Sequence, residues 1–299
     1  MSNIRQMQLS KRRQKWVRNR TTTLVGAPLN HNISLEGRYE SLLTRMAERL
    51  SGEYTREVIK LLRMPQWKDE FTTDSSIVSQ VNILFNHLDA KFRKIFKQQS
   101  REHAREMIQA INRVSRTSTQ NSLKKLSGGL TISTDFITDR MKDQMRAFVV
   151  ENENLIEDIH SKYTFKVQTQ VLEEIQNPQP DGIKGLIKRL ENSFQRDSGI
   201  VRRRAKNIAH DQVRQAYNNL NANRMLAIGQ TKFKWVHSKG GMNPREWHLN
   251  HLDGNVYDLT DPPVIDPVTG VRGIPGQLIG CKCFMVPVIE FDEGQPVGK

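Results

Sequence analysis

The sequence contains little cysteine and no long apolar run. Its 299 residues include only two cysteines, which excludes a disulfide framework and, within one chain, a zinc site made of four cysteines. No apolar stretch approaches the ~20 residues that a transmembrane helix needs. No signal-peptide core follows the basic residues at the start. We therefore expect no membrane-spanning segment.

Several catalytic signatures are also missing. The sequence has no GxxxxGK[ST] phosphate loop, no GxGxxG, no HExxH and no GxSxG. ATP hydrolysis and serine hydrolase chemistry therefore have no support from motifs. We predict that the protein is not an enzyme.

Acidic residues are absent from the first 35 positions, and the chain as a whole is basic. The net charge is +14, from 46 Lys and Arg against 32 Asp and Glu. Clustered cations gain affinity at phosphates, so a polyanion is the first partner to consider, with a merely solvated surface as the alternative. Residues 1–35 form a basic arm suited to DNA, anionic lipid or an acidic protein surface. The cations of this arm are Arg5, Lys11, Arg12, Arg13, Lys15, Arg18 and Arg20.

Helical periodicity follows the arm. Apolar residues recur at steps of three and four before Pro65, which predicts an amphipathic helix. The stripe consists of Tyr39, Leu43, Met46, Leu50 and Tyr54. A second helix is expected over 76–112, a turn at 128–129 and a third helix over 136–175. We predict a mainly α fold with an elongated helical region over 36–180.

The next segment, 183–229, predicts two further helices, of which the second carries a basic cluster at its start. The cluster consists of Arg202, Arg203, Arg204 and Lys206. Cations at the amino-terminal end of a helix oppose the helix dipole, so an external anion would relieve them. We therefore consider this cluster a second candidate contact with DNA or with an acidic partner.

Short strands and Pro/Gly-rich loops complete the sequence. The alternating segments "TKFKWVHS" (231–238) and "CKCFMVPVIEF" (281–291) predict strands,. Together with the preceding helices, they predict a small α+β C-terminal domain over 181–299.

Candidate metal ligands occur in "WHLNHLDG" (247–254) and "GCKC" (280–283). Two histidines and two cysteines give the number of ligands that a zinc site needs: His248, His251, Cys281 and Cys283. Alternate residues on a strand stand ~6.5–7 Å apart, so a turn would have to bring the two thiols together. Otherwise the cysteines pack as small buried apolar residues.

The same stretch allows a nuclease hypothesis. His248, His251 and Asp253 offer a general base and hard ligands for a divalent ion, as metal-dependent phosphodiester hydrolysis requires. Asp253 and Gly254 alternatively form a turn in which the glycine takes a positive φ. The turn is the preferred interpretation.

An ordered series of features extends over roughly residues 150–290. It begins with a helix containing "RAKNIAHDQ" and a strand containing "KW", and ends with a Pro-rich loop and Cys-x-Cys. Between them lie Arg245, His248, Asp253 and Gly254. This pattern resembles the Mu F-type phage head morphogenesis (minor head) family. The family commonly has Arg in place of His210 and Lys282, and His251 is not part of its pattern.

The resemblance implies both a local structure and a biological role. Arg245, His248 and the Asp253-Gly254 turn would form a scaffold that is braced against the two cysteines, with zinc as the one candidate cofactor. The protein would be a minor head protein of a tailed dsDNA phage, bound to the portal inside the head and acting in assembly, DNA packaging or genome ejection.

Expected partners and location follow from the same resemblance. The partners are the portal protein, the major capsid or scaffold protein, and dsDNA bound without sequence preference. The location is the head interior of the virion, and the host cytoplasm during assembly. The alternatives are a metal-dependent nuclease and a non-specific DNA-binding protein without a role in the head.

Overall fold

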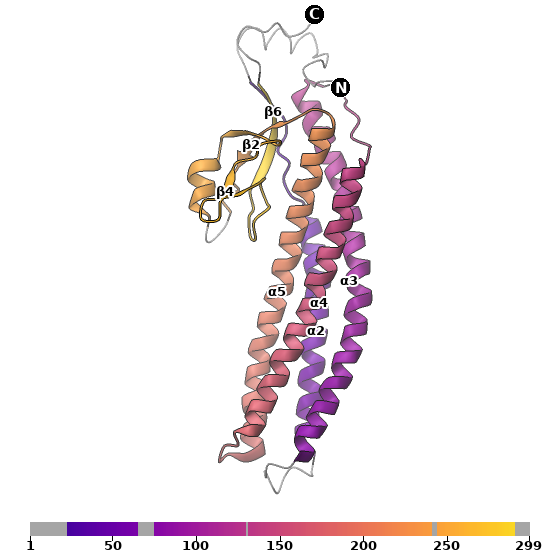
Figure 1. Ribbon diagram of the computed structural model, residues 1–299, viewed down its shortest axis with the longest axis vertical. Helices are drawn as coiled ribbons and strands as arrows, with labels where there is room; N and C mark the ends of the chain where they lie inside the picture. The colour runs from indigo at the N-terminus through magenta and orange to yellow at the C-terminus, as the bar shows by residue number, and fades with distance from the viewer. Residues whose placement is uncertain (1–22, 65–74, 130, 241–243, 291–299) are drawn as a thin grey trace, which may run out of the picture. The chain divides into compact units, whose positions relative to one another are not determined.

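Four long helices and a small set of strands make up the described part of the protein. The computed structural model describes residues 23–64, 75–129, 131–240 and 244–290. Within these ranges the long helices (Figure 1) are α2 (Ile33–Leu62), α3 (Ser75–Leu126), α4 (Asp139–Gln176) and α5 (Gly182–Ala227). The prediction of a mainly α fold with a small α+β C-terminal part is confirmed. Among the described helices, none is both long and apolar enough to cross a membrane.

The described chain divides into two compact units. The bundle unit consists of residues Gly37–Arg105 and Val149–Ala209, and the sheet unit consists of the described parts of Met1–Glu36, Glu106–Phe148 and His210–Lys299. Each unit therefore combines segments that are distant in sequence. The predicted boundary at 180–181 falls in the turn between α4 and α5.

Aromatic side chains form the centre of the bundle unit. The predicted stripe on α2 is buried along its whole length, from Tyr39 to Tyr54. The Tyr54 ring lies 5.6 Å from the ring of Phe85, 5.7 Å from that of Phe92 and 5.8 Å from that of Tyr163. Burial of one such side chain contributes about 1.5–3 kcal/mol. The Tyr54 hydroxyl is also satisfied, by a 2.8 Å hydrogen bond with Thr164.

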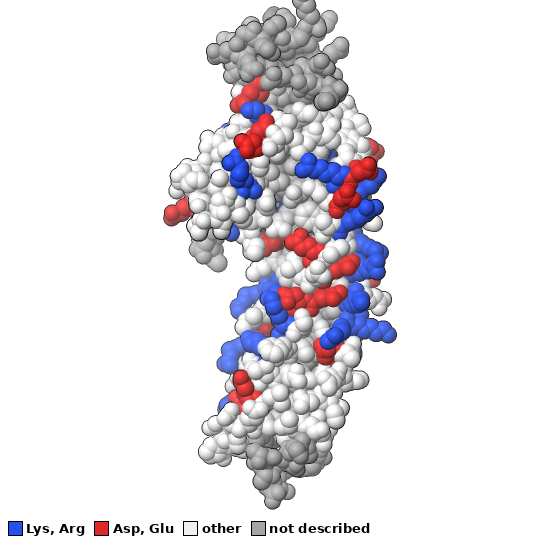
Figure 2. All heavy atoms as spheres, viewed as in Figure 1, with Lys and Arg blue, Asp and Glu red and all other residues white. Residues whose placement is uncertain are grey.

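Ion pairs cover the outside of the bundle unit. Figure 2 shows Lys and Arg side chains beside Asp and Glu side chains along the helices of the visible face. Asp158, for example, accepts from both Lys162 and Arg204. On this face the positive charge is largely compensated by neighbouring carboxylates.

Two predicted helix boundaries were wrong. The helix expected to end at 112 continues to Leu126, where Gly128 and Gly129 take positive φ values of 75° and 119° and the Gly129 N–H donates to Lys124 O. The helix expected from 136 begins at Asp139, because the Thr138 hydroxyl caps it by accepting from the Met141 N–H;.

The prediction of two helices over 183–229 was also wrong, because α5 is continuous. A glycine inside a helix costs about 1 kcal/mol. Burial of Phe194 and Val201 on either side of Gly199 offsets this cost. The basic cluster that begins at Arg202 therefore lies in the middle of α5, some twenty residues after Gly182, and not at a helix start. The helix-dipole reason for an anion at this cluster does not apply.

The sheet unit contains an antiparallel four-stranded sheet in the order β1-β6-β2-β3. Trp235 of β2 pairs with Met285 of β6, and both side chains are fully buried together with Phe233. The strand predicted over 231–238 is confirmed as β2. The remaining strands form a hairpin, β4 with β5. The strand bounds are β1 Thr23–Val25, β2 Lys232–Val236, β3 Val256–Asp258, β4 Val264–Asp266, β5 Val271–Arg272 and β6 Phe284–Glu290.

Candidate metal centre

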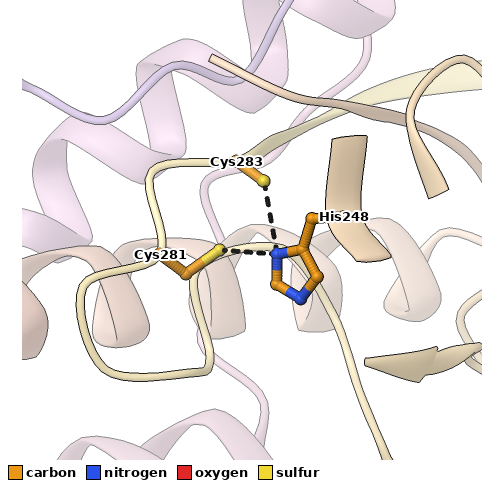
Figure 3. Close-up of side chains that lie close together, drawn as sticks. All are labelled: His248, Cys281 and Cys283. Atoms are coloured by element: carbon orange, nitrogen blue, oxygen red, sulfur yellow. Dashed lines mark hydrogen bonds between the residues drawn. The ribbon is translucent and has the colours of Figure 1, made fainter. Parts of the chain in front are cut away.

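One histidine and both cysteines meet inside the sheet unit. His248 comes from the short π-helical turn η3 (His248–Leu252), and Cys281 and Cys283 come from the segment that leads into β6. Both sulfur atoms lie 3.6 Å from His248 Nδ1 (Figure 3). One ligand atom from each residue lies within 4.8 Å of the other two. All three side chains are buried, with at most 4% exposed.

The cysteines converge because they do not belong to a strand. The closing strand was predicted to include them, but β6 begins at Phe284. Before it, Gly280 takes a φ of +72° and the Cys281 N–H donates to Leu278 O, so the chain turns at this point. The spacing of ~6.5–7 Å expected for alternate strand residues therefore does not apply.

The His248 ring is oriented for its Nδ1 atom to bind. Nε2 lies 2.9 Å from the carbonyl oxygen of Ile265. A carbonyl only accepts, so Nε2 carries the proton and the Nδ1 lone pair faces the two sulfurs. The Trp235 ring packs edge-on against the imidazole, with 5.2 Å between ring centroids. A backbone carbonyl that fixes the tautomer in this way is the usual support of a metal-binding histidine.

The two thiols titrate as a pair. Their mutual hydrogen bond has the largest influence on each of them: it lowers the pKa of Cys281 and raises the pKa of Cys283. The contact with His248 also lowers the pKa of Cys281, and burial raises the pKa of both thiols, so that the net pKa of Cys281 is about 4. One thiolate within the pair is therefore favoured at neutral pH, and a thiolate is the form that binds metals.

Helix α5 holds the segment that carries the cysteines. The Gly280 N–H donates to Asp211 Oδ1 at 2.6 Å, and the Gln215 side chain donates to Gln277 O at 2.8 Å. Asp211 lies within "AHDQ", where no pattern in the sequence predicts a role for it. The one feature that could have pointed to Asp211 is that "AHDQ" and the two cysteines belong to the same family-like series of features.

Close packing against α5 also requires a glycine. Gly276 has a φ of +80°, and a Cβ at this position would lie 2.3 Å from Asn218 Nδ2. A side chain at position 276 would therefore be strained and would push the loop away from the helix. Arg245 Nη2 donates to Ile279 O of the same loop at 2.8 Å. Arg245 thus connects the stretch before η3 to the loop of the cysteines.

The other candidates near His248 lie elsewhere. His251 is exposed and stacks on Trp247, with 4.2 Å between ring centroids. Asp253 Oδ1 accepts from the His237 N–H at 2.8 Å, and Gly254 takes a φ of +84° in the turn. Of the three residues in the nuclease hypothesis, the described structure brings only His248 into the cluster.

The two groups of cations predicted to contact DNA or the portal differ in what the structure describes of them. The cations of the arm, from Arg5 to Arg20, lie outside the described residues. Most of the basic cluster on α5 is already paired within the bundle unit: Arg202 with Glu48, Arg204 with Asp158 and Lys206 with Glu40. Arg203 is exposed. The cluster therefore offers less free positive charge than its sequence suggests.

The arrangement of His248, Cys281 and Cys283 suits a borderline-soft metal ion. Zn²⁺ binds thiolate at about 2.3 Å and imidazole at about 2.0–2.1 Å, which places sulfur and nitrogen about 3.6 Å apart at a tetrahedral angle. The observed distances from Nδ1 to each sulfur agree with this value. Burial of both thiols disfavours attack on a substrate, so the geometry favours holding an ion.

Comparison with known proteins identified no relative. No protein-family model matches the chain, and neither a search of curated proteins nor a search of solved structures found a match. The family suggested by the resemblance is therefore a proposal that depends on the residues of this chain and on their geometry.

Proposed function

We propose that the protein is a minor head protein of a tailed dsDNA phage, bound to the portal inside the head. One observation supports this most: the separate pieces of the resemblance converge in the sheet unit. His248 contacts both cysteines, Arg245 binds the loop before them, and Asp211 of "AHDQ" binds the same loop. These residues, spread over some seventy positions of the chain, thus lie at one place in the fold, as the parts of a single motif are expected to do.

The proposal includes partners and a location. The portal protein is the main partner, with the major capsid or scaffold protein and packaged DNA as further contacts. The protein would act in assembly, packaging or ejection without catalysing a reaction. Its place would be the head interior of the virion, after passage through the host cytoplasm.

Co-purification with the portal tests the role. Full-length tagged protein is recovered from infected cells under native conditions, and portal subunits are expected in the eluate. A Gly276→Trp variant, in which the loop is displaced from α5, is expected to recover less portal, while an exposed-site variant, Asp261→Ala, is expected to recover as much as wild type. Absence of portal from the wild-type eluate would show the proposed role to be wrong.

We further propose that His248, Cys281 and Cys283 hold zinc as a structural ion. The ion would replace the shared thiol proton and tie the π-helical turn to the segment before β6. The described residues supply three ligands, and zinc completes its coordination with water or another donor. The ion would brace the sheet unit, since binding that requires the folded site stabilises the folded state.

Elemental analysis tests the zinc site. Protein purified without chelator is expected to contain about one zinc per chain. His248→Gln and Cys281→Ser are expected to lose the metal, while His251→Gln, which changes the exposed neighbouring histidine, is expected to retain it. A metal-free wild-type protein whose melting temperature does not respond to added Zn²⁺ would refute the site.

A further inference from the structure

Helix α2 presents a line of positive charge to solvent. Six exposed cations follow one another at steps of seven, four, seven, four and three residues: Arg38, Arg45, Arg49, Arg56, Lys60 and Arg63. Five belong to α2, and Arg63 follows its last residue in the same turn, with its N–H donating to Ile59 O. At 100° per residue these steps keep the six side chains within about 60° of one another around the helix axis. The buried stripe from Tyr39 to Tyr54 lies on another face of α2, centred roughly 110° away around the helix axis;.

The acidic residues of α2 neutralise only part of this line, since Glu57 alone among them is paired with one of its cations, Arg56. Three of them pair with cations of the flanking helices α5 and α3. These pairs are Glu40 with Lys206, Glu48 with Arg202, and Glu53 with Lys91. Three acids of α2 thus compensate cations of the neighbouring helices, and part of the positive charge along the exposed face of α2 remains unpaired.

Four of the six cations have no ion-pair partner among the described residues. Arg56 pairs with Glu57, and Arg63 pairs with Glu191. The other four are Arg38, Arg45, Arg49 and Lys60, of which Arg45 only donates to the backbone, at Ser41 O. Cations that lack an ion pair and repel one another along a helix destabilise it slightly, although the nearby Glu57 carboxylate attracts Lys60;. An external anion with regularly spaced charges would remove this cost.

The length of the line indicates the kind of anion. Twenty-five residues separate Arg38 from Arg63, and a helix rises 1.5 Å per residue, so the line extends about 38 Å. This is close to one turn of duplex DNA, about 34–36 Å. Duplex DNA carries one charge for each ~1.7 Å of its axis, so several phosphates lie within reach of such a row. Five of the six cations are arginines, whose planar guanidinium binds phosphate with two hydrogen bonds.

We propose that the exposed face of α2, from Arg38 to Arg63, is a binding surface for the phosphate backbone of duplex DNA. DNA is chosen over an acidic protein because of the length of the row and its arginine content. This inference rests on the proposed function in one respect: a protein inside a phage head would be in contact with duplex DNA. This surface differs from the cluster at 202–206, in which most cations are ion-paired with acidic residues of α2 and α4.

Salt-dependent DNA binding tests the surface. The full-length chain and a variant with Arg38, Arg45, Arg49 and Lys60 replaced by Gln are titrated onto a labelled duplex at several salt concentrations, with fluorescence anisotropy as the readout. Glutamine preserves helix propensity, and circular dichroism verifies folding. Each lost phosphate contact reduces the slope of log K against log salt by about 0.9, so a reduction of up to about 3.6 is expected.

A matched variant separates a defined surface from general charge. Lys94, Lys97, Arg101 and Arg105 are exposed on α3 in the same unit. Their replacement by Gln removes the same four charges. A larger loss of slope and affinity in the α2 variant supports the proposal, whereas an equal or smaller loss overturns it.

The portal test distinguishes the two levels of the proposal. If the α2 variant loses DNA affinity but still recovers portal, the DNA surface and the head role both stand. If it loses portal and retains wild-type DNA binding, the surface binds an acidic protein and the assignment to DNA is overturned.

Discussion

His160 is a buried histidine whose surroundings favour its neutral form. Its ring packs against Phe96 with 5.5 Å between centroids, and its Nε2 lies 3.3 Å from Asp89 Oδ1. Burial lowers the pKa of His160, and nearby Arg93 lowers it further, while Asp89 acts in the opposite direction. The net lowering means that the folded protein holds this histidine in its neutral form more strongly than the unfolded chain does.

We expect stability to fall as the pH drops below about 6.5, the usual histidine pKa. In that range the unfolded chain binds the proton more readily, so stability decreases until the lower pKa of the folded state is reached. The check is the melting temperature measured between pH 7.5 and 5.5. His160→Gln should reduce this pH dependence, although His31, whose pKa burial also lowers, will leave part of it. An exposed control, His87→Gln, should keep the wild-type slope, and an unchanged slope in His160→Gln would contradict the assignment.

Individual buried apolar residues could be predicted from the sequence, but buried charges could not. The stripe from Tyr39 to Tyr54 follows from periodicity alone. Arg224, in contrast, is 1% exposed, and its guanidinium donates to Ser115 and to the backbone oxygens of Thr134 and Phe136. These acceptors lie about 90 to 110 residues away in sequence, so the residues around Arg224 gave no indication that it would be buried and hydrogen-bonded.

Among the elements, α5 and the loop before β6 determine the metal centre together. The loop forms few hydrogen bonds of its own, and Asp211 and Gln215 hold it from α5. Burial raises the pKa of Asp211, whereas the bond from the Gly280 N–H lowers it. The Asp211 side chain accepts the Gly280 N–H at 2.6 Å and so fixes the turn before Cys281.

We expect Asp211→Ala to weaken zinc binding by about 10- to 100-fold, the usual effect of losing a residue that orients a metal ligand. Competition against a chromophoric chelator measures the affinity. Asp261→Ala is the control, because Asp261 is exposed and pairs with Arg272 away from the cysteines. Equal affinities for the two variants would show that α5 does not position the loop.

Element type was predictable where a period extends over many residues, and element ends were less so. The period of α2 and the alternation in β2 each predicted the right structure. Gly199 suggested a break between two helices, but α5 is continuous because buried residues on both sides of Gly199 stabilise the helix. The start of β6 was misjudged because Cys281 and Cys283 alternate with Lys282 like strand residues, while the turn at Gly280 depends on contacts with α5.

At the scale of the whole molecule, a metal that braces the sheet unit should leave the bundle unit unaffected. The three ligands all belong to the sheet unit, and no described residue of the bundle unit joins the group. Removal of zinc should therefore lower protection in one unit only.

Hydrogen exchange with mass spectrometry checks this expectation. After chelation, amides of β2 and β6 should exchange at least tenfold faster, and those of α2 and α4 in the bundle unit should keep their rates. Cys281→Ser should show the faster exchange without chelator and should not respond to it. Faster exchange in both units alike would mean that the ion does not act locally.

The composition of the candidate site was only partly predictable. The sequence supplied His248, Cys281 and Cys283 but also His251, because two histidines three apart resemble a ligand pair. Whether a residue joins the site depends on which side of the π-helical turn it faces, and the His251 ring stacks on neighbouring Trp247 instead. The spacing of the two histidines in the sequence does not indicate which of them faces the cysteines.

The pairing of β1 with β6 determines when each unit can form during synthesis. Thr23 lies opposite Glu290, so β1, the first described strand, cannot pair until β6, the last described strand, has been synthesised. All described residues of the bundle unit, in contrast, precede residue 210. The bundle unit can therefore fold before β6 (Phe284–Glu290) has been synthesised, whereas the sheet and the metal centre are completed only after β6 has been made;.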